Sequence, residues 1–128
     1  MRQPKIPKPT EAELAILRVL WEHGPATVRQ IHDSLPSARS VGYTTVLKML
    51  QIMTEKGLVL RDEKQRSHIY RSAIGEEQTQ RQLVRDLLDR AFGGSAKKLV
   101  MQALTAKKRS PDELAQIRSL LDQMEGQS

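Results

Sequence analysis

The stretch SVGYTTVLKMLQIMTEKG, residues 40–57, decides the fold that this sequence predicts. It predicts a single helix, because Gly57 follows the basic Lys56 as a glycine does just past a helix C-terminus. With a turn of about 100° per residue, one side of the helix gathers the apolar side chains Val46, Leu47, Leu50 and Met53. The opposite side carries Val41, Thr44, Thr45, Lys48 and Ile52.

The polar side of this helix has three hydrogen-bonding side chains in its first half, Thr44, Thr45 and Lys48. In a helix-turn-helix protein this half of the recognition helix enters the major groove. Threonine contacts base edges or thymine methyl groups, and lysine reaches guanine acceptors or phosphates. An ordinary amphipathic surface helix is the alternative for the stretch taken alone. The residues that we expect to contact DNA from this helix are Ser40, Val41, Tyr43, Thr44, Thr45 and Lys48.

Two shorter helices are predicted before it. Thr10 and Glu13 form a capping box that starts the first, which Gly24 and Pro25 end. Its apolar repeat makes it central to the core, through Leu14, Leu17 and Trp21. A second capping box, formed by Thr27 and Gln30, starts a helix of about two turns that ends at Pro36. Helix, short helix, turn and longer helix is the order of a helix-turn-helix.

After Gly57 the pattern becomes strand-like. Residues 58–61 and 68–71 are β-prone runs on either side of the polar loop 62–67, which predicts a hairpin. A hairpin in this position is the wing of a winged helix, and a solvated charged turn is the alternative. The residues that we expect to meet the DNA backbone, from the second helix and the wing, are Thr27, Arg29, Lys64, Arg66 and His68.

From residue 75 onward the sequence predicts three amphipathic helices, which bury their apolar faces better against a second copy than on one another. A closed monomeric three-helix packing is the alternative. The expected dimer interface consists of Leu83, Leu87, Phe92, Leu99, Val100, Leu104, Leu114, Ile117 and Leu121. The predicted fold class is therefore mainly α, with a winged helix-turn-helix domain at 1–74 and a helical dimerisation domain at 75–128.

The charge distribution agrees with this division. Of the net charge of +6, residues 1–74 carry 12 Lys/Arg against 7 Asp/Glu, and residues 75–128 carry 9 against 8. A basic first half suits a polyanion-binding module. The first nine residues, with three prolines, predict a flexible or extended arm. Neither a secretory signal nor an apolar run of the roughly 20 residues that a membrane span needs is present. We therefore expect a cytoplasmic protein.

The sequence argues against an enzyme. It has no cysteine and no Gly-rich phosphate loop. Its three histidines, His23, His32 and His68, fall on three different elements without the spacing of a metal site. We expect no catalytic residue, no metal and no cofactor.

Several motifs give the chain a resemblance to a known family. They are ELAILRVLW at 13–21, TVRQI at 27–31, YTTVL at 43–47, EKGLV at 55–59, FGGS at 92–95 and SPDEL at 110–114. In their order and spacing the chain resembles the BlaI/MecI/CopY family of bacterial repressors, the penicillinase-repressor type. The resemblance implies a homodimer with an N-terminal winged helix, which binds an inverted-repeat operator in double-stranded DNA and represses neighbouring genes.

The chain departs from two branches of that family. The copper-responsive branch uses a C-terminal cysteine cluster, which is absent here. In the β-lactam branch a sensor protease pathway leads to cleavage of an Asn-Phe bond in the dimerisation helices. Alignment on residues 97–100 puts Gln102 and Ala103 at that position. Two other functions stay open, a ligand-sensing repressor whose effector lies between the two halves and a winged helix that binds protein without a specific DNA site.

Overall fold

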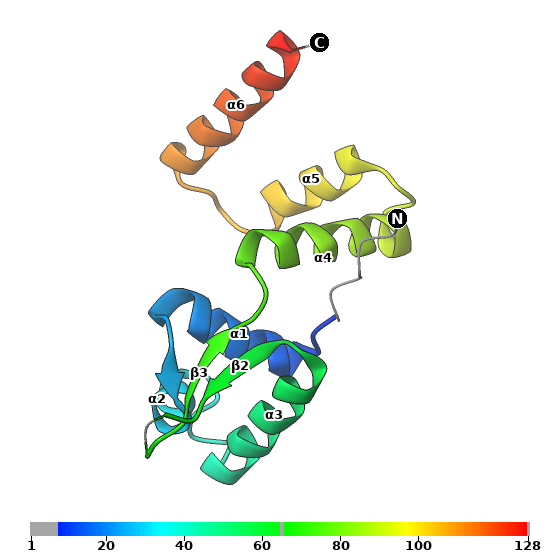
Figure 1. Cartoon of the computed structure of the whole chain (residues 1–128). Coiled ribbons are helices and arrows are strands. Elements are labelled where there is room, and N and C mark those ends of the chain that lie inside the picture. Colours follow the sequence, from blue (N-terminus) through cyan, green and yellow to red (C-terminus); the bar gives the residue numbers. More distant parts are fainter. Residues whose placement is uncertain (1–7, 65, 128) are drawn as a thin grey trace. The chain divides into compact units, whose positions relative to one another are not determined.

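Capping boxes start the first two helices, as predicted. In the computed structural model, which describes residues 8–64 and 66–127, helix α1 spans Glu11–His23 and helix α2 spans Val28–Ser34 (Figure 1). The hydroxyl of Thr10 accepts the N–H of Glu13, and the Glu13 carboxylate accepts the N–H of Thr10. The same pair of bonds joins Thr27 and Gln30 at the start of α2. Most of the predicted N-terminal arm lies outside the described residues.

Helix α3 spans Tyr43–Lys56, so the prediction that it begins at Ser40 is wrong. The backbone N–H groups of Ser40 and Val41 both donate to the carbonyl of Ser37, at 2.9 and 3.0 Å, and hold these residues in a turn. Gly42 is the extended N-cap residue, with φ −77° and ψ 158°. The predicted C-terminus is confirmed, because Gly57 adopts the left-handed conformation and its N–H bonds the last turn of the helix.

A small antiparallel sheet completes the winged helix, and α1, α2 and α3 lie around it (Figure 1). Strands β2, Val59–Asp62, and β3, Ile69–Ser72, form the predicted hairpin. The sequence analysis missed a two-residue strand, β1, Ala26–Thr27, which pairs with β3 on its other edge. Strand β3 is therefore the central strand of the order β1-β3-β2.

The hydrophobic core lies within this winged helix. Its members come from the three helices and the sheet, and they are Ile16, Leu17, Val19, Leu20, Ala26, Val28, Ile31, Leu35, Val46, Leu50, Met53, Leu58, Val59 and Tyr70. The half-buried Trp21 closes one side, where its indole N–H donates to the Ser72 hydroxyl and the Ile74 carbonyl. The prediction that the first helix is central to the core is confirmed, but its buried apolar residues are Ile16, Leu17, Val19 and Leu20, and Leu14 is only half-buried.

An ion pair ties α1 to the end of α3. The Lys56 ammonium lies 2.8 Å from the buried carboxylate of Glu13. Burial by itself raises the pKa of Glu13, but the hydrogen bonds from Lys56 and Thr10 and the Lys56 charge outweigh it, so the pKa lies below its ordinary value. The carboxylate that caps α1 thus also fixes the C-terminal turn of α3.

Three further helices follow, in agreement with the sequence: α4, Glu76–Ala91, α5, Ala96–Ala106, and α6, Pro111–Gly126. The chain forms two compact units, Met1–Leu83 and Val84–Ser128, so the first half of α4 groups with the winged helix. Neither α5 nor α6 contains a buried residue. In the described part of the chain no helix is both long and apolar enough to cross a membrane.

Candidate nucleic-acid interface

The polar face predicted for α3 is exposed. Val46, Leu50 and Met53 are fully buried and hold the helix against the core. This orientation turns the other side of the helix to solvent, with its exposed residues Thr44, Thr45, Lys48 and Ile52. The division between the two sides follows from the helical period, as the sequence predicts.

The threonines of this face differ from the other helical threonines. The hydroxyls of Thr54, Thr79 and Thr105 each donate to the backbone carbonyl four residues earlier. Among the described residues, no hydrogen bond or ion pair engages the side chains of Thr44 and Thr45, nor that of Lys48. All the donors and acceptors of these side chains are therefore available to a ligand.

A histidine fastens the turn that precedes α3. His32 Nδ1 lies 3.1 Å from Asp33 Oδ1, and Nε2 lies 2.5 Å from the carbonyl oxygen of Val41. Both partners only accept hydrogen bonds, so both ring nitrogens can donate only when the imidazole is protonated. The Asp33 carboxylate and the Val41 carbonyl accordingly raise the pKa of His32. Ser40 and Val41, predicted as part of the recognition helix, belong to this turn.

The N-terminus of α2 places a cation beside the start of α3. The hydroxyl of Thr27 is occupied by its capping bond to Gln30. Arg29 is exposed, and its guanidinium carbon lies 5.4 Å from the ring centroid of Tyr43, in cation–π range. Tyr43, at the start of α3, therefore also contacts a side chain of α2.

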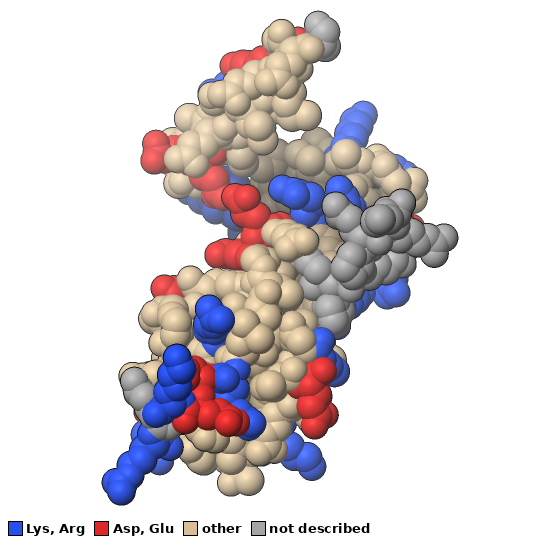
Figure 2. All heavy atoms as spheres, viewed as in Figure 1, with Lys and Arg blue, Asp and Glu red and all other residues tan. Residues whose placement is uncertain are grey.

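The wing is cationic at its tip. Lys64, Arg66 and His68 are exposed, and Lys and Arg side chains project around the hairpin tip at the lower left of Figure 2. Two acidic residues lie in the same hairpin, where Asp62 accepts the backbone N–H of Lys64 and Glu63 pairs with Arg61. Within the described residues, no ion pair or hydrogen bond engages the side chains of Lys64 and Arg66.

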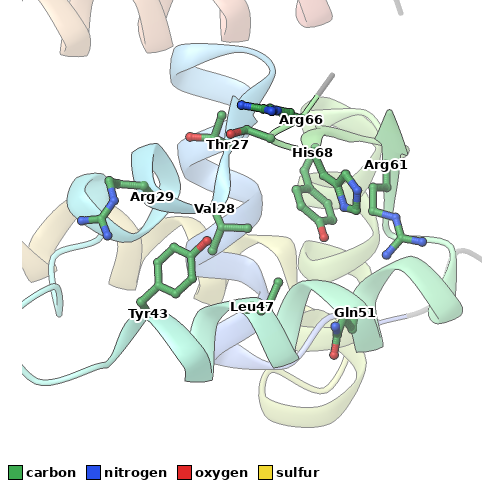
Figure 3. A pocket seen from close by; sticks show the side chains of 11 residues that line it. Thr27, Val28, Arg29, Tyr43, Leu47, Gln51, Arg61, Arg66 and His68 are labelled. Carbon is green, nitrogen blue, oxygen red and sulfur yellow. The ribbon is translucent and has the colours of Figure 1, made fainter. Parts of the chain in front are cut away.

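A cavity of about 570 Å³ separates the wing from α2 and α3. In Figure 3, Arg61 and His68 of the wing lie on one side of it, and Arg29 and Tyr43 lie on the other. Five of the sequence-predicted DNA contacts line this cavity, namely Thr27, Arg29, Tyr43, Arg66 and His68. The others, Ser40, Val41, Thr44, Thr45, Lys48 and Lys64, do not line it.

The sequence analysis missed two cavity residues that face each other across the sheet. Arg61 of β2 pairs in register with Tyr70 of β3, so the two side chains lie on the same face. The Tyr70 hydroxyl and Glu63 raise the pKa of Arg61, although no hydrogen bond of good geometry joins Arg61 to the hydroxyl. The β-prone runs contained both residues, but only the register brings them together. Gln51, one turn beyond Leu47 on α3, also went unnoticed.

The predicted dimer-interface residues lie on α4, α5 and α6 and the turn after α4, and none of them is buried. Leu87, Val100, Leu114 and Leu121 are exposed, and the remaining five, Leu83, Phe92, Leu99, Leu104 and Ile117, are half-buried. Gln102 and Ala103, at the position predicted for cleavage, are both exposed on α5. No group of three or more His, Cys, Asp or Glu residues that could hold a metal ion is found among the described residues.

Comparison with known proteins gives consistent matches along the chain. Residues 9–123 match the penicillinase repressor family. The transcriptional regulator BlaI of Mycobacterium tuberculosis is 30% identical over 122 residues, which cover 94% of this chain and 88% of that protein. The penicillinase repressor of Bacillus licheniformis is 23% identical, with 93% of each chain covered. The solution structure of the B. licheniformis BlaI monomeric form in complex with the blaP half-operator is 24% identical. It covers 57% of this chain and 89% of that one, with a TM-score of 0.48.

Proposed function

This chain belongs to the penicillinase repressor family, and we propose from that premise that two copies of it bind an inverted-repeat operator in double-stranded DNA. As a member of that family it is a transcriptional repressor and not an enzyme. We further propose which residues contact DNA, which helices form the dimer and how repression ends.

The observation that carries the proposal is the unengaged polar face of α3. Thr44, Thr45 and Lys48 are exposed in the first turns of the helix, and their side chains have no partner among the described residues. Such side chains at the N-terminal half of a recognition helix contact base edges in the major groove. The wing adds Lys64 and Arg66, which contact phosphates and position the helix without reading sequence.

Pairing is assigned to α4, α5 and α6. The exposed large hydrophobic residues of these helices include Leu87 at 48%, Leu121 at 53% and Met124 at 59% of full exposure. Removing such apolar surface from water is favourable by about 25 cal/mol per Å², which supports association of two copies. Each dimer then presents two copies of α3 to half-sites about one helical turn of DNA apart, ~34 Å.

Loss of the dimer would end repression. Two linked DNA contacts reinforce each other through effective concentration. Separating the copies therefore weakens operator binding without changing the winged helix of either copy. Cleavage between Gln102 and Ala103, by a sensor protease pathway, would remove α6 and shorten α5. Because this bond lies inside a helix, the protease needs α5 to unfold locally before it can cut.

The test is a selection of genomic fragments on the full-length protein, followed by measurement of affinity for the enriched duplex. We expect an enriched inverted repeat, and binding whose logarithm falls linearly with the logarithm of salt concentration, because phosphate contacts release counterions. A scrambled duplex of equal length is the control for specificity. Enrichment of no common sequence, with equal affinity for both duplexes, would contradict the proposal.

A further inference from the structure

The cavity between the wing and α3 has properties that DNA reading alone does not require. Its volume of about 570 Å³ falls in the range of small-molecule sites, roughly 300–1,000 Å³. Three arginines and a histidine line it, Arg29, Arg61, Arg66 and His68. No carboxylate is among its lining residues, although Glu63 pairs with Arg61 from outside the lining. The lining itself is therefore positively charged, which favours an anion.

The rest of the lining is apolar and aromatic. Val28 and Leu47 come from α2 and α3, and the rings of Tyr43 and Tyr70 face the cavity from α3 and the sheet (Figure 3 labels the first three). A bound inorganic phosphate would leave these apolar and aromatic side chains without a contact. An anion with a flat apolar body would cover them while its head group meets the cations.

The hydroxyl of Tyr70 lies close enough to Arg61 to raise the pKa of that group, but it is poorly satisfied. Tyr70 is completely buried, and its hydroxyl makes no hydrogen bond of acceptable geometry to any described residue. A buried hydroxyl without a partner destabilises the protein, so such a group in a native fold calls for a bonding partner. Arg61 stands opposite it in the sheet register, and Glu63, which pairs with Arg61, is a largely exposed carboxylate. An exposed ion pair of this kind is weak, so a bound anion can take its place.

We propose that this cavity binds a small organic anion, with a phosphate or carboxylate head and a flat apolar body, through Arg61, His68 and the Tyr70 hydroxyl. A shift of the Arg61 side chain opens the hydroxyl to the head group. Occupancy then competes with DNA, because Arg29, Tyr43, Arg66 and His68 line the cavity and are also expected DNA contacts. This second step rests on the proposed function, and the first does not.

The binding test uses phenyl phosphate as the probe, titrated into the full-length protein without DNA in a calorimeter. We expect phenyl phosphate to bind at least tenfold more tightly than inorganic phosphate, because only the former covers the apolar lining. Arg61→Gln should weaken this binding roughly tenfold. The matched control is Arg71→Gln, because Arg71 lies on β3 next to Tyr70, is exposed and does not line the cavity. Equal losses in the two arginine variants would show unspecific charge attraction and overturn the site.

Tyr70→Phe separates a binding role of the hydroxyl from a structural one. The substitution removes a hydroxyl that makes no hydrogen bond of good geometry, so the melting temperature should stay the same or rise. Phenyl phosphate binding should nevertheless weaken roughly tenfold. A lower melting temperature with unchanged binding would assign the hydroxyl to the fold and overturn its part in the site.

Competition with duplex DNA distinguishes the two sources of anionic groups. Phenyl phosphate should displace the selected operator from the wild type, and this displacement should weaken in Tyr70→Phe. The small-molecule site would be overturned if phenyl phosphate did not bind and if Arg61→Gln, but not Arg71→Gln, lowered operator affinity. That result would indicate that the cavity binds a DNA phosphate. If the wild type bound phenyl phosphate and no duplex, the proposed function would fail and the anion site would stand.

Discussion

The winged helix and the helices that follow it differ in where their apolar side chains lie. Apart from Pro9, every buried apolar side chain of the described residues falls between Ile16 and Tyr70. Helices α5 and α6 contain no buried residue, although both carry several apolar side chains. The first region therefore has a core of its own, and the second has apolar faces without one.

This difference separates two kinds of stability. A region with its own core unfolds with a free energy that does not depend on protein concentration, whereas a region completed by a second copy is stabilised by mass action. If two copies pair through the second region, as we propose, they can separate while the DNA-binding winged helix of each stays folded.

The largest effect on operator affinity is expected from removing the C-terminal helices. A fragment of residues 1–83 keeps the whole core and the buried Thr79, and it should unfold cooperatively as a monomer. Its affinity for a full operator should fall at least tenfold at equal salt, because two reading heads are no longer linked. Sedimentation and fluorescence anisotropy measure the two properties. Equal affinity of fragment and intact protein would mean that the C-terminal helices do not pair reading heads.

A charge on the apolar faces should act in the same direction. Leu87→Asp and Leu121→Asp place a carboxylate where the proposed interface cannot solvate it, at a cost to dimerisation of several kcal/mol. Leu60→Asp is the matched control, because Leu60 is similarly exposed but lies on the wing. The dimer dissociation constant from sedimentation should change in the first two variants only. A wild type that is monomeric at tens of micromolar would remove the basis of this prediction.

Truncating a leucine should distinguish the regions by stability. Leu50 is fully buried in α3, so Leu50→Ala should lower the free energy of unfolding of the fragment 1–83 by about 2–5 kcal/mol. Leu47→Ala, on the half-buried edge of the same helix, should cost clearly less. Urea unfolding followed by circular dichroism measures both. Similar costs at the two positions would mean that burial does not set the stability of this unit.

Within the reading head, α3 and the wing should differ in sequence discrimination. Thr45→Ala and Lys48→Ala should lose roughly 1–3 kcal/mol of preference for the operator over a mismatched site. Lys64→Ala and Arg66→Ala should weaken binding to all duplexes alike and lower the salt slope, because phosphates carry no sequence information. Affinities for operator and mismatched duplexes at several salt concentrations decide this. The reverse pattern would place sequence readout in the wing.

The smallest effect concerns pH and the turn before α3. The pKa of His32 is raised in the folded protein by Asp33 and the Val41 carbonyl, so its contribution is complete below the unfolded pKa of about 6.5 and is lost as pH rises through the folded value. Stability of the fragment 1–83 should therefore decline slightly across this range. Asp33→Asn should flatten the decline, because it removes the main cause of the shift. A decline of the same size in Asp33→Asn would assign it to another group.

Two parts of the expected DNA interface show what can and what cannot be predicted from the sequence. Thr45 and Lys48 could be assigned to the exposed face because the helical period alone separates them from Val46 and Leu50. Arg61 was not predicted, because its place beside the cavity depends on its pairing with Tyr70. A strand pattern gives each side chain a face but leaves the register to turn geometry and core contacts.

Features that depend on short-range bonds and helical periodicity can be predicted from the residues alone. The capping boxes at Thr10 and Thr27 and the end of α3 at Gly57 follow from bonds between residues three to five apart. The start of α3 at Tyr43 also involves short-range bonds, those of Ser40 and Val41 to Ser37, which the sequence analysis did not recognise. The pairing of β1 with the sheet and the cavity beside the wing arise only in the folded chain. These depend on distant partners, as in the bond of Trp21 to Ile74 across 53 residues. Such partners meet only when the core is assembled, because burial of apolar surface rather than local preference brings them together.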